Sequence, residues 1–322
     1  MSKYILVTGG AGYVGSHTCK LLKDKGYDPV IFDNLSTGHK TLAMWGEFIK
    51  GDLREFKEIN KLLKKVKPKY IIHLAALADI GQSNKNPDLY YSNNIISTIN
   101  LLKSMRENKI KNILFSSSCS IFGNTKKKNV FETDKKNPES PYAYTKYICE
   151  NLIRSSSVDK GINYVILRYF NAAGASSSGL IGEKKSTRII PQIIKTFLNK
   201  NKKLIINGTN FDTFDGTCIR DFIHVDDVAM AHLKSIEYLR SKKKNDDFNI
   251  GSGKGYSILQ LIKIMENYFS NKINIESKKK RFGDAPYLVS SIRKAKINLN
   301  WRPSNSSINN IIESAVKWEK TQ

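Results

Sequence analysis

Short apolar runs alternate with amphipathic stretches through the first half of the chain. These runs have the length of buried strands, whereas the stretches between them repeat their apolar positions with helical spacing. Strands are expected at Tyr4–Thr8, Pro29–Phe32, Glu47–Lys50, Tyr70–Leu74, Asn112–Ser116 and Tyr164–Arg168. Helices are expected at Gly12–Lys25, Arg54–Val66, Asp88–Asn108 and Tyr142–Asp159. This alternation predicts an α/β protein with a doubly wound parallel sheet.

The pattern becomes less regular after Arg168. Residues 171–187 are rich in glycine, alanine and serine, as expected of a substrate loop or a domain hinge. Further helices are expected at Ile189–Asn199, Val225–Leu239, Ser257–Phe269 and Asn305–Glu319, and an extended segment at Lys203–Asn207. We therefore expect a first domain of residues 1–170 and a smaller α/β domain of residues 171–322. The chain is expected to return to the first domain at about residues 219–240.

A glycine-rich turn joins the first predicted strand to the first predicted helix. Gly9, Gly12 and Gly15 fall on a G-x-x-G-x-x-G spacing, a variant of the dinucleotide-binding fingerprint. Such glycines allow a tight turn, a close approach of the backbone to a pyrophosphate, and close contact between helix and strand. The following helix directs its free N–H groups and its positive dipole end at the phosphates. Many strand-to-helix turns use glycine, so the triplet alone is weak evidence.

An acidic residue after the second predicted strand strengthens the nucleotide interpretation. Asp33 follows the apolar run of residues 30–32, close to the offset of ~20 residues that a Rossmann-type site uses. A carboxylate at this position accepts hydrogen bonds from a ribose 2′-OH and repels a 2′-phosphate. The sequence therefore favours NAD over NADP.

Small and polar residues also follow the other predicted strands, as in Asp52-Leu53, Leu74-Ala75-Ala76 and Ser116-Ser117-Ser118. Right-handed crossovers place the carboxyl ends of parallel strands along one edge of the sheet. Ligands of such sheets bind at that edge. We expect the site there.

Composition narrows the class of protein. The 322 residues are 40% hydrophobic and 25% charged, as in a soluble globular protein. No apolar run reaches membrane-spanning length, and the first strand begins too early to leave room for a signal peptide. Cys19, Cys119, Cys149 and Cys218 show neither paired nor metal-ligand spacing. We expect a cytoplasmic protein that binds no membrane and no metal.

The net charge of +24 is unusual. Basic residues cluster at Lys61–Lys69, Lys126–Lys128, Lys242–Lys244 and Lys278–Arg281. One interpretation is a nucleic-acid-binding surface. The other is a solvated surface in a chain rich in lysine, asparagine and isoleucine. Since no aromatic residues interrupt these clusters, we prefer the second and expect no nucleic-acid partner.

Tyr142 and Lys146 lie four residues apart at the start of a predicted helix, and so on one helix face. The pKa of a free tyrosine, about 10, is too high for a base at neutral pH. A neighbouring ammonium group and a positively charged nicotinamide would both favour the phenolate. The spacing is common on ordinary helices and, taken alone, favours a purely structural role.

The catalytic interpretation of this pair is strengthened because Ser116-Ser117-Ser118 ends the preceding strand, where a hydroxyl can bond a substrate oxygen. Serines after a strand also serve as caps or in turns. Together with the glycine turn, the set indicates hydride chemistry on a carbinol.

Longer motifs extend almost from end to end. They are Val7–His17, Asp33–Leu35, Gly51–Asp52, Tyr91–Asn94, Phe115–Ser118, Ser140–Tyr142, Leu167–Asn171, Gly216–Val225 and Arg281–Asp284. On these motifs the chain resembles the extended short-chain dehydrogenase/reductase superfamily and, within it, the UDP-hexose 4-epimerase family. The dinucleotide half indicates only the superfamily, whereas the C-terminal motifs point to a UDP-sugar. The resemblance implies an NAD-binding first domain, a UDP-sugar-binding second domain and a homodimer.

The resemblance also implies roles for individual residues. Tyr142 would be the base, Lys146 would lower its pKa and hold the nicotinamide ribose, and Ser118 would bond the sugar hydroxyl. Besides Tyr142 and Lys146, the NAD pocket would comprise Gly9, Gly12, Tyr13, Val14, Gly15, Asp33, Asn34, Leu35, Ser36, Thr37, Gly38, Asp52, Leu53, Leu74, Ala75, Ala76, Asn93 and Phe170. Besides Ser118 and Tyr142, the UDP-sugar would be held by Asn171, Arg188, Arg220, Arg281, Asp284 and Leu288. Arginine suits a diphosphate because its guanidinium stays charged and binds oxygens in pairs.

Several positions depart from the family pattern. Ala78 stands where relatives often carry a lysine, and Arg188 where they commonly carry asparagine or histidine. Cys119-Ser120 replaces the acidic pair that sugar-nucleotide dehydratases use to eliminate water. The resemblance therefore implies a redox-neutral inversion at C4 of a UDP-hexose, such as UDP-glucose or UDP-galactose, through a 4-keto intermediate.

Two alternatives remain open. One is the same chemistry on a UDP-N-acetylhexosamine or a UDP-pentose. Leu288 bears on it, since the resemblance places this residue at the C2 side of the sugar, where a tyrosine excludes an N-acetyl group. The other alternative is a catalytically silent protein that senses NAD on the same fold.

Overall fold

The computed structural model describes residues 3–125, 127–184, 187–199, 203–242 and 244–322. Lys126 and Lys243, which belong to two of the basic clusters, lie outside these ranges. Within them, a parallel sheet of seven strands has the order β10-β6-β5-β4-β1-β2-β3. Its strands are β1 (Tyr4–Thr8), β2 (Asp28–Asp33), β3 (Glu47–Lys50), β4 (Tyr70–His73), β5 (Asn112–Ser118), β6 (Asn163–Tyr169) and β10 (Asp246–Ile250). The predicted doubly wound parallel sheet is confirmed.

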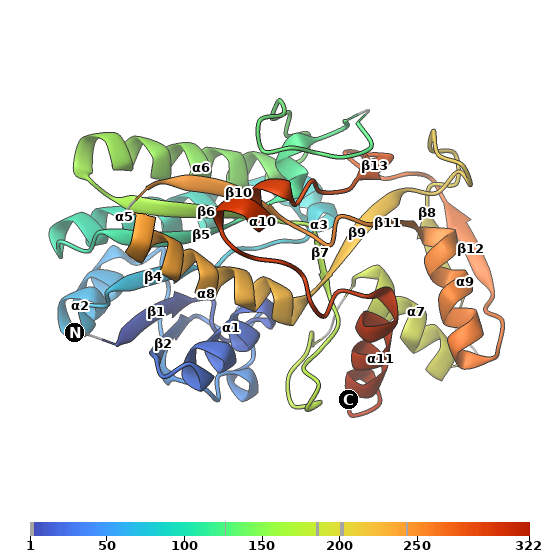
Figure 1. Ribbon diagram of the computed structural model, residues 1–322, viewed down its shortest axis with the longest axis horizontal. Helices are drawn as coiled ribbons and strands as arrows, with labels where there is room; N and C mark the ends of the chain where they lie inside the picture. Colours follow the sequence, from blue (N-terminus) through green and yellow to red (C-terminus); the bar gives the residue numbers. More distant parts are fainter. Residues whose placement is uncertain (1–2, 126, 185–186, 200–202, 243) are drawn as a thin grey trace.

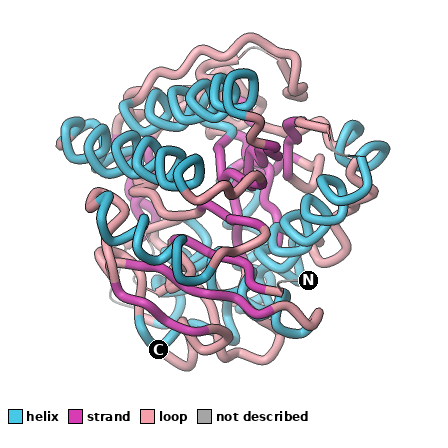
Figure 2. Tube along the Cα trace, turned by 90° about the vertical axis from the view of Figure 1, so that its left-hand side faces the viewer, coloured by secondary structure: helices cyan, strands magenta, loops and turns pink. Residues whose placement is uncertain are grey.

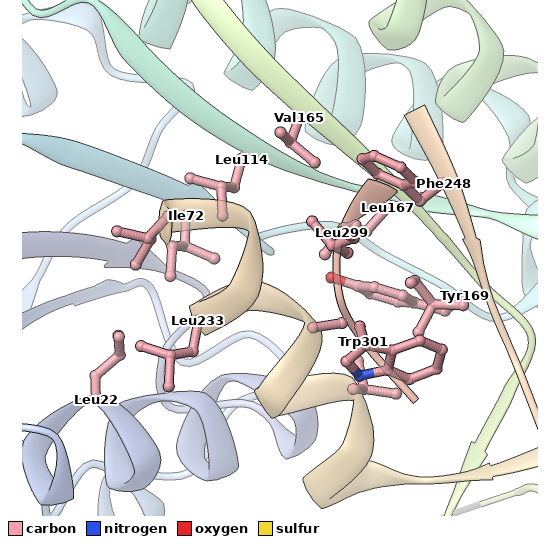
Figure 3. Close-up of a cluster of buried hydrophobic side chains, with 14 of the residues drawn as sticks. Leu22, Ile72, Leu114, Val165, Leu167, Tyr169, Leu233, Phe248, Leu299 and Trp301 are labelled. Carbon is pink, nitrogen blue, oxygen red and sulfur yellow. The ribbon is translucent and has the colours of Figure 1, made fainter. Parts of the chain in front are cut away.

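Helices cover both faces of this sheet (Figures 1 and 2). One face carries α1 (Tyr13–Asp24) and α8 (Val225–Lys242), and the other carries α2 (Phe56–Val66), α5 (Ser97–Glu107) and α6 (Pro141–Lys160). Alternate strand residues enter the two cores, so that Val7 faces α1 while Leu6 faces α2. Figure 3 shows the first core, where Leu114 and Leu233 belong to one buried cluster.

Two helical segments near the ligand edge have distinctive local features. Helix α6 begins where Ser140 accepts a hydrogen bond from the Ala143 N–H at 3.2 Å, with Pro141 in its first turn. The helix expected over Asp88–Asn108 is divided into α4 (Pro87–Tyr90), the π-helix η2 (Tyr91–Ile96) and α5. A π turn inserts one residue per turn, and it often occurs next to functional sites.

The smaller sheets lie to the other side of the ligand edge (Figure 1). Strand β9 (Ile219–His224) pairs with β7 (Asn171–Ala173), β11 (Gly255–Ser257) and β13 (Tyr287–Leu288), and β8 (Leu204–Asn207) pairs with β12 (Ile275–Lys278). Helices α7 (Ile189–Leu198), α9 (Ile258–Phe269) and α11 (Ile308–Glu319) share a third core with these strands. The shorter elements are η1 (Lys40–Leu42), α3 (Ile80–Lys85), η3 (Cys119–Phe122) and α10 (Arg293–Asn298). Among the described residues, no helix combines the length and the apolar character needed to cross a membrane.

Candidate active site

A cavity of about 810 Å³ opens at the carboxyl ends of the parallel strands. It lies where the strand order reverses, between β1 and β4, which is the position expected of a ligand site in such sheets. Its lining includes residues from both the large sheet and the smaller sheets. A volume of this size is within the range of cofactor and substrate pockets.

The glycine turn after β1 forms one wall of the cavity. Gly9 has a φ of +73°, and a Cβ atom there would lie 2.6 Å from the Ala75 nitrogen. A Cβ on Gly15 would lie 2.2 Å from the Gly9 oxygen. Both positions therefore require glycine, and the turn brings α1, β1 and the segment after β4 together. Gly12, Tyr13 and Val14 line the cavity at the start of α1.

Asp33 ends β2 at the same edge. Its carboxylate accepts hydrogen bonds from the N–H groups of Ala11 at 3.1 Å and Leu35 at 2.8 Å. Burial raises the pKa of Asp33, and these two bonds oppose that rise. Gly38 leaves room beside the carboxylate, because a Cβ there would lie 2.9 Å from its Oδ1.

Most residues expected around the cofactor line the cavity, and Leu35 does not. Asn34, Ser36, Thr37, Gly38, Asp52, Leu53, Leu74, Ala75, Ala76, Asn93 and Phe170 are in the lining. Leu35 has a φ of +62° and packs against the first core instead. Asn34 donates to Asp52 at 3.0 Å, while Arg54 is the main cause that lowers the pKa of Asp52 to about 2. Asp52 is therefore a carboxylate at neutral pH.

Tyr142, Lys146 and Ser118 also line the cavity. Tyr142 and Lys146 are buried on α6, and Ser118 is at the end of β5. The Ser118 hydroxyl lies close enough to Tyr142 to lower the pKa of its phenol. The Lys146 ammonium donates to the Ser116 carbonyl at 2.7 Å and lies 5.0 Å from the centre of the Phe115 ring. The end of β5 thus contacts both Tyr142, through Ser118, and Lys146, through Ser116.

The electrostatics of this trio differ from the simple expectation. Burial raises the pKa of Tyr142 to about 12, against the lowering effects of the Ser118 hydrogen bond and the Arg188 charge. Burial also lowers the pKa of Lys146 to about 8. Among the protein groups, Lys146 is therefore not what lowers the Tyr142 pKa, because its amine points to a backbone carbonyl. A positively charged ring next to Tyr142 would favour the phenolate.

A group of cationic and polar residues lines the other end of the cavity. It comprises Asn171, Arg188, Arg220, Arg281 and Asp284. The Arg220 guanidinium donates to the carbonyls of Ile219 at 3.0 Å and Ala285 at 2.7 Å, and lies 3.8 Å from Asp284. These bonds fix a charged group on β9 beside the loop that carries Arg281. Such a wall suits a diphosphate.

Arg188 precedes α7 and reaches across the cavity toward α1. It pairs with Glu183 at 3.1 Å, donates to the Ala172 carbonyl at 3.0 Å and lies 5.7 Å from the centre of the Tyr13 ring. Tyr13 in turn donates to the Gly174 carbonyl at 2.6 Å. The position that departs from the family pattern is thus held between the two halves of the site.

Leu288 lies on β13 and is 9% exposed. It lines the cavity and also belongs to a small apolar cluster with Cys119 and Phe170. Burial raises the pKa of the Cys119 thiol to about 12, so that this side chain acts as an apolar neighbour. A bulkier residue at position 288 would project toward Cys119, Phe170 or the cavity.

Two residues that support the site were missed in the sequence. Glu183 anchors Arg188, and the buried Asn94 on η2 donates to the Leu77 carbonyl at 3.1 Å and to Thr145 at 2.9 Å. Asn94 therefore joins the segment after β4 to the helix of Tyr142 and Lys146. A polar pair in a predicted apolar helix was the available signal for Asn94, whereas nothing local indicated Glu183.

The residues present fit NAD. The turn at Gly9 and Gly12 provides a phosphate cradle, Asp33 provides the acceptor for a ribose, and Lys146 and Tyr142 line the same cavity. Chemically, the trio can transfer a proton to and from a hydroxyl while the cationic end holds a phosphorylated substrate.

Known protein families, sequences and structures resemble this chain over most of its length. The model of the NAD dependent epimerase/dehydratase family matches residues 5–251. The UDP-glucose 4-epimerase of Rhizobium meliloti is 41% identical over 316 residues, covering 98% of this chain and 96% of that protein. The structure of the Brucella ovis UDP-glucose 4-epimerase in complex with NAD has a TM-score of 0.93 and 38% identity, covering 97% of each chain. That of the Bifidobacterium longum enzyme with NAD+ and UDP has a TM-score of 0.93 and 32% identity, covering 99% of this chain and 98% of that one.

Proposed function

Because the chain belongs to the NAD dependent epimerase/dehydratase family, we propose that it is an NAD-dependent UDP-glucose 4-epimerase. It interconverts UDP-glucose and UDP-galactose by inverting C4 through a 4-keto intermediate, without net oxidation. The observation that carries this proposal is the convergence of Tyr142, Ser118 and Lys146 on a cavity that also contains the glycine turn and a cationic wall.

Tyr142 removes the proton of the sugar 4-OH and returns it at the end of the cycle. Ser118 bonds the same sugar oxygen and orients it toward the phenol. When bound, NAD would supply the hydride acceptor and donor for C4 of the sugar. Lys146, one turn along α6 from Tyr142 and held by the Ser116 carbonyl, would bind the nicotinamide ribose. General acid–base catalysis of this kind contributes about 10²–10⁴-fold in rate.

The inversion requires a firm hold on UDP and a loose hold on the sugar. Arg220 and Arg281 bind the diphosphate, with Asn171, Arg188 and Asp284 beside them. Arg220 is suited to this task because two carbonyls and Asp284 already fix its guanidinium. Since Arg220 is on β9 and Arg281 on the loop before β13, whereas Tyr142 is on α6, the 4-keto sugar can turn over while UDP stays in place.

Binding of the cofactor and binding of the substrate are assigned to successive parts of the chain. Residues 1–170 bind NAD and residues 171–322 bind the UDP-sugar, while α8 packs back on α1. All four cysteines are buried and unpaired, which supports a reducing compartment such as the cytoplasm.

A homodimer is also proposed. Tyr91, Ile96, Ile99 and Tyr144 are exposed apolar side chains on η2, α5 and α6. A second copy of the chain can cover this face by packing the same helices against it, as in an isologous dimer. Exposed apolar side chains gathered on one face favour an interaction site.

The test is to incubate the purified protein with UDP-galactose and to follow UDP-glucose by NMR. Conversion to an equilibrium mixture is expected without added oxidant when the protein carries NAD. A silent NAD-binding protein would leave the substrate unchanged, whereas a dehydrogenase would accumulate NADH with the product.

A further inference from the structure

Two serines meet where the end of β5 turns into the short helix η3. The Ser120 hydroxyl donates to the Ser118 hydroxyl oxygen at 3.0 Å, and the Ser120 backbone N–H donates to the same oxygen at 3.2 Å. Both serines line the cavity. The hydroxyl that is proposed to bond the sugar oxygen is therefore itself bonded twice by a neighbour two residues along the chain.

These two bonds determine how Ser118 can act. A hydroxyl group has two acceptor lone pairs and one hydrogen that it can donate. Because the two Ser120 donors take up the lone pairs, the Ser118 oxygen has no acceptor capacity left for a third group. Its hydrogen can still be donated. Ser118 is thereby fixed as a hydrogen-bond donor toward the cavity.

The other groups beside Ser118 agree with this polarity. Burial is the main cause that raises the pKa of Tyr142 and of Cys119 to about 12, and the Ser118 hydroxyl opposes the rise in both. A hydroxyl lowers the pKa of an acid when it donates to the anion. The Cys119 sulfur is only a weak acceptor. The Ser118 hydrogen therefore goes to an oxygen, that of Tyr142 or that of a bound sugar.

The turn that carries Ser120 is held firmly. Ile121 and Phe122, the next two residues, are 0% and 3% exposed and belong to the apolar cluster that includes Leu288. The Ile121 carbonyl accepts from the Asn137 N–H at 2.8 Å. Packing and backbone contacts thus keep the Ser120 hydroxyl in reach of Ser118.

Gly123 ends this turn. It has a φ of +61°, and a Cβ atom there would lie 1.9 Å from the Asn137 oxygen. Only glycine fits this position, so the chain passes close to Asn137 on both sides of Phe122. The geometry of the serine pair therefore follows from the path of the backbone.

We infer that Ser120 is a positioning residue for the proposed reaction: by filling the acceptor sites of Ser118, it keeps that hydroxyl a donor toward the sugar 4-oxygen. This inference rests on the proposed function, in which C4 of the sugar passes through a ketone. A ketone oxygen can only accept hydrogen bonds, so the intermediate requires a donor at this place. Ser120 exerts this effect through Ser118.

A purely structural role for Ser120 predicts a different result. Ser118 caps η3, and the capping bond comes from the Ser120 N–H, which any residue except proline can donate. The bond from the Ser120 hydroxyl is additional to that cap. Loss of the hydroxyl should therefore change the behaviour of Ser118 and leave the start of η3 intact.

The test is a double-mutant cycle on the NAD-loaded protein with UDP-galactose. Ser120→Ala opens one acceptor site on Ser118, so that the Ser118 hydroxyl can turn away from the sugar oxygen. We expect kcat to fall about 3–10-fold, the range that one neutral hydrogen bond gives, with KM within about twofold. In a Ser118→Ala background the same change should have no further effect, because the two residues act as one unit.

Two substitutions of similar size separate the hydroxyl from its bulk. Ser120→Thr keeps the hydroxyl and should retain most of the wild-type kcat. Ser120→Val has the shape of threonine without the hydroxyl, and should lose as much as Ser120→Ala. This pair decides the matter if Ser120→Ala does not fold.

Ser178→Ala is the matched control. Ser176 and Ser178 share a hydrogen bond between their hydroxyls at 2.7 Å, and the Ser178 N–H donates to the Ser176 oxygen at 3.3 Å. The same serine pair thus occurs on a loop, at residues that do not line the described cavity. We expect kcat of Ser178→Ala to equal that of the wild type.

The outcomes are distinct. A loss in Ser120→Ala and Ser120→Val that disappears in the Ser118→Ala background, with Ser120→Thr and Ser178→Ala active, supports the inference. Equal losses with and without the Ser118 hydroxyl, full activity in Ser120→Val, or an equal loss in Ser178→Ala would overturn it and leave the proposed function intact. A wild-type protein that does not epimerise UDP-galactose would overturn the proposed function, and the inference with it.

Discussion

The phenol of Tyr142 carries the proton transfer in the proposed reaction, and it is buried beside Ser118. Tyr142→Phe keeps the ring and loses the acid–base group. We expect kcat to fall by about 10²–10⁴-fold, with UDP affinity nearly unchanged when measured by calorimetry. Tyr144→Phe is the matched control, two residues along α6 on its exposed side. Comparable losses in both variants would contradict the assignment of the base.

Leu288 is the residue at which substrate size can be tested. It lines the cavity next to Cys119 and Phe170, and overpacking of such a site costs about 1–3 kcal/mol. We expect good activity on UDP-galactose and weaker activity on UDP-N-acetylgalactosamine. Leu288→Tyr should suppress the second activity and largely spare the first. Parallel assays of both sugars check this, and equal losses on both would show that Leu288 only packs the apolar cluster.

At the level of single residues, motif spacing predicted site residues that adjoin a strand or helix recognisable in the sequence. Gly9, Asp33 and Tyr142 could be placed at the cavity because each follows or begins a recognisable element. Leu35 could not, because a left-handed backbone at φ +62° turns its side chain toward the core. Asn94 and Glu183 were not found, since their roles depend on partners that are distant in the sequence or come from a loop.

The contact between α1 and the turn after β1 is the element-level feature that shapes the cofactor wall. Gly15→Ala would place a methyl group 2.2 Å from the Gly9 oxygen and 2.7 Å from the Gly10 Cα. Because both neighbours are backbone, α1 must move away from the turn. We expect a loss of about 1–3 kcal/mol in stability and clearly weaker NAD binding.

Gly81→Ala serves as the control, since the nearest atom to its Cβ is the flexible Asp79 carboxylate at 3.3 Å. Urea unfolding and NAD titration measure the two effects. Unchanged NAD affinity in Gly15→Ala would mean that the close helix–strand contact does not form the phosphate cradle.

Strands and helices were predictable where a local sequence pattern is enough to specify them. The six strands from β1 to β6 were expected within a few residues, because each is a short apolar run between turns. Strand β10 was missed because Asp246 and Asp247 interrupt its apolar pattern and its partner β6 lies far back in the sequence. The π-helix η2 was missed because one extra residue per turn leaves little trace in apolar spacing.

At the scale of the whole molecule, the apolar face on α5 and η2 should govern assembly. Ile96 and Ile99 are 44% and 43% exposed there. The double variant Ile96→Glu/Ile99→Glu should convert the dimer to a monomer, because four charges would meet across a two-fold interface. Size-exclusion chromatography with light scattering measures this. Ile297→Glu, at a residue 68% exposed on α10, should leave the dimer intact. A wild-type protein that is monomeric would contradict the proposed homodimer.

The central claim is a redox-neutral inversion in which the hydride that leaves C4 returns to C4. The most direct measurement follows UDP-galactose deuterated at C4, with mass spectrometry and NMR of the product and absorbance for NADH. We predict UDP-glucose that retains deuterium at C4, with no NADH accumulating over many turnovers. Loss of the label to solvent, or NADH formed in proportion to product, would contradict the account.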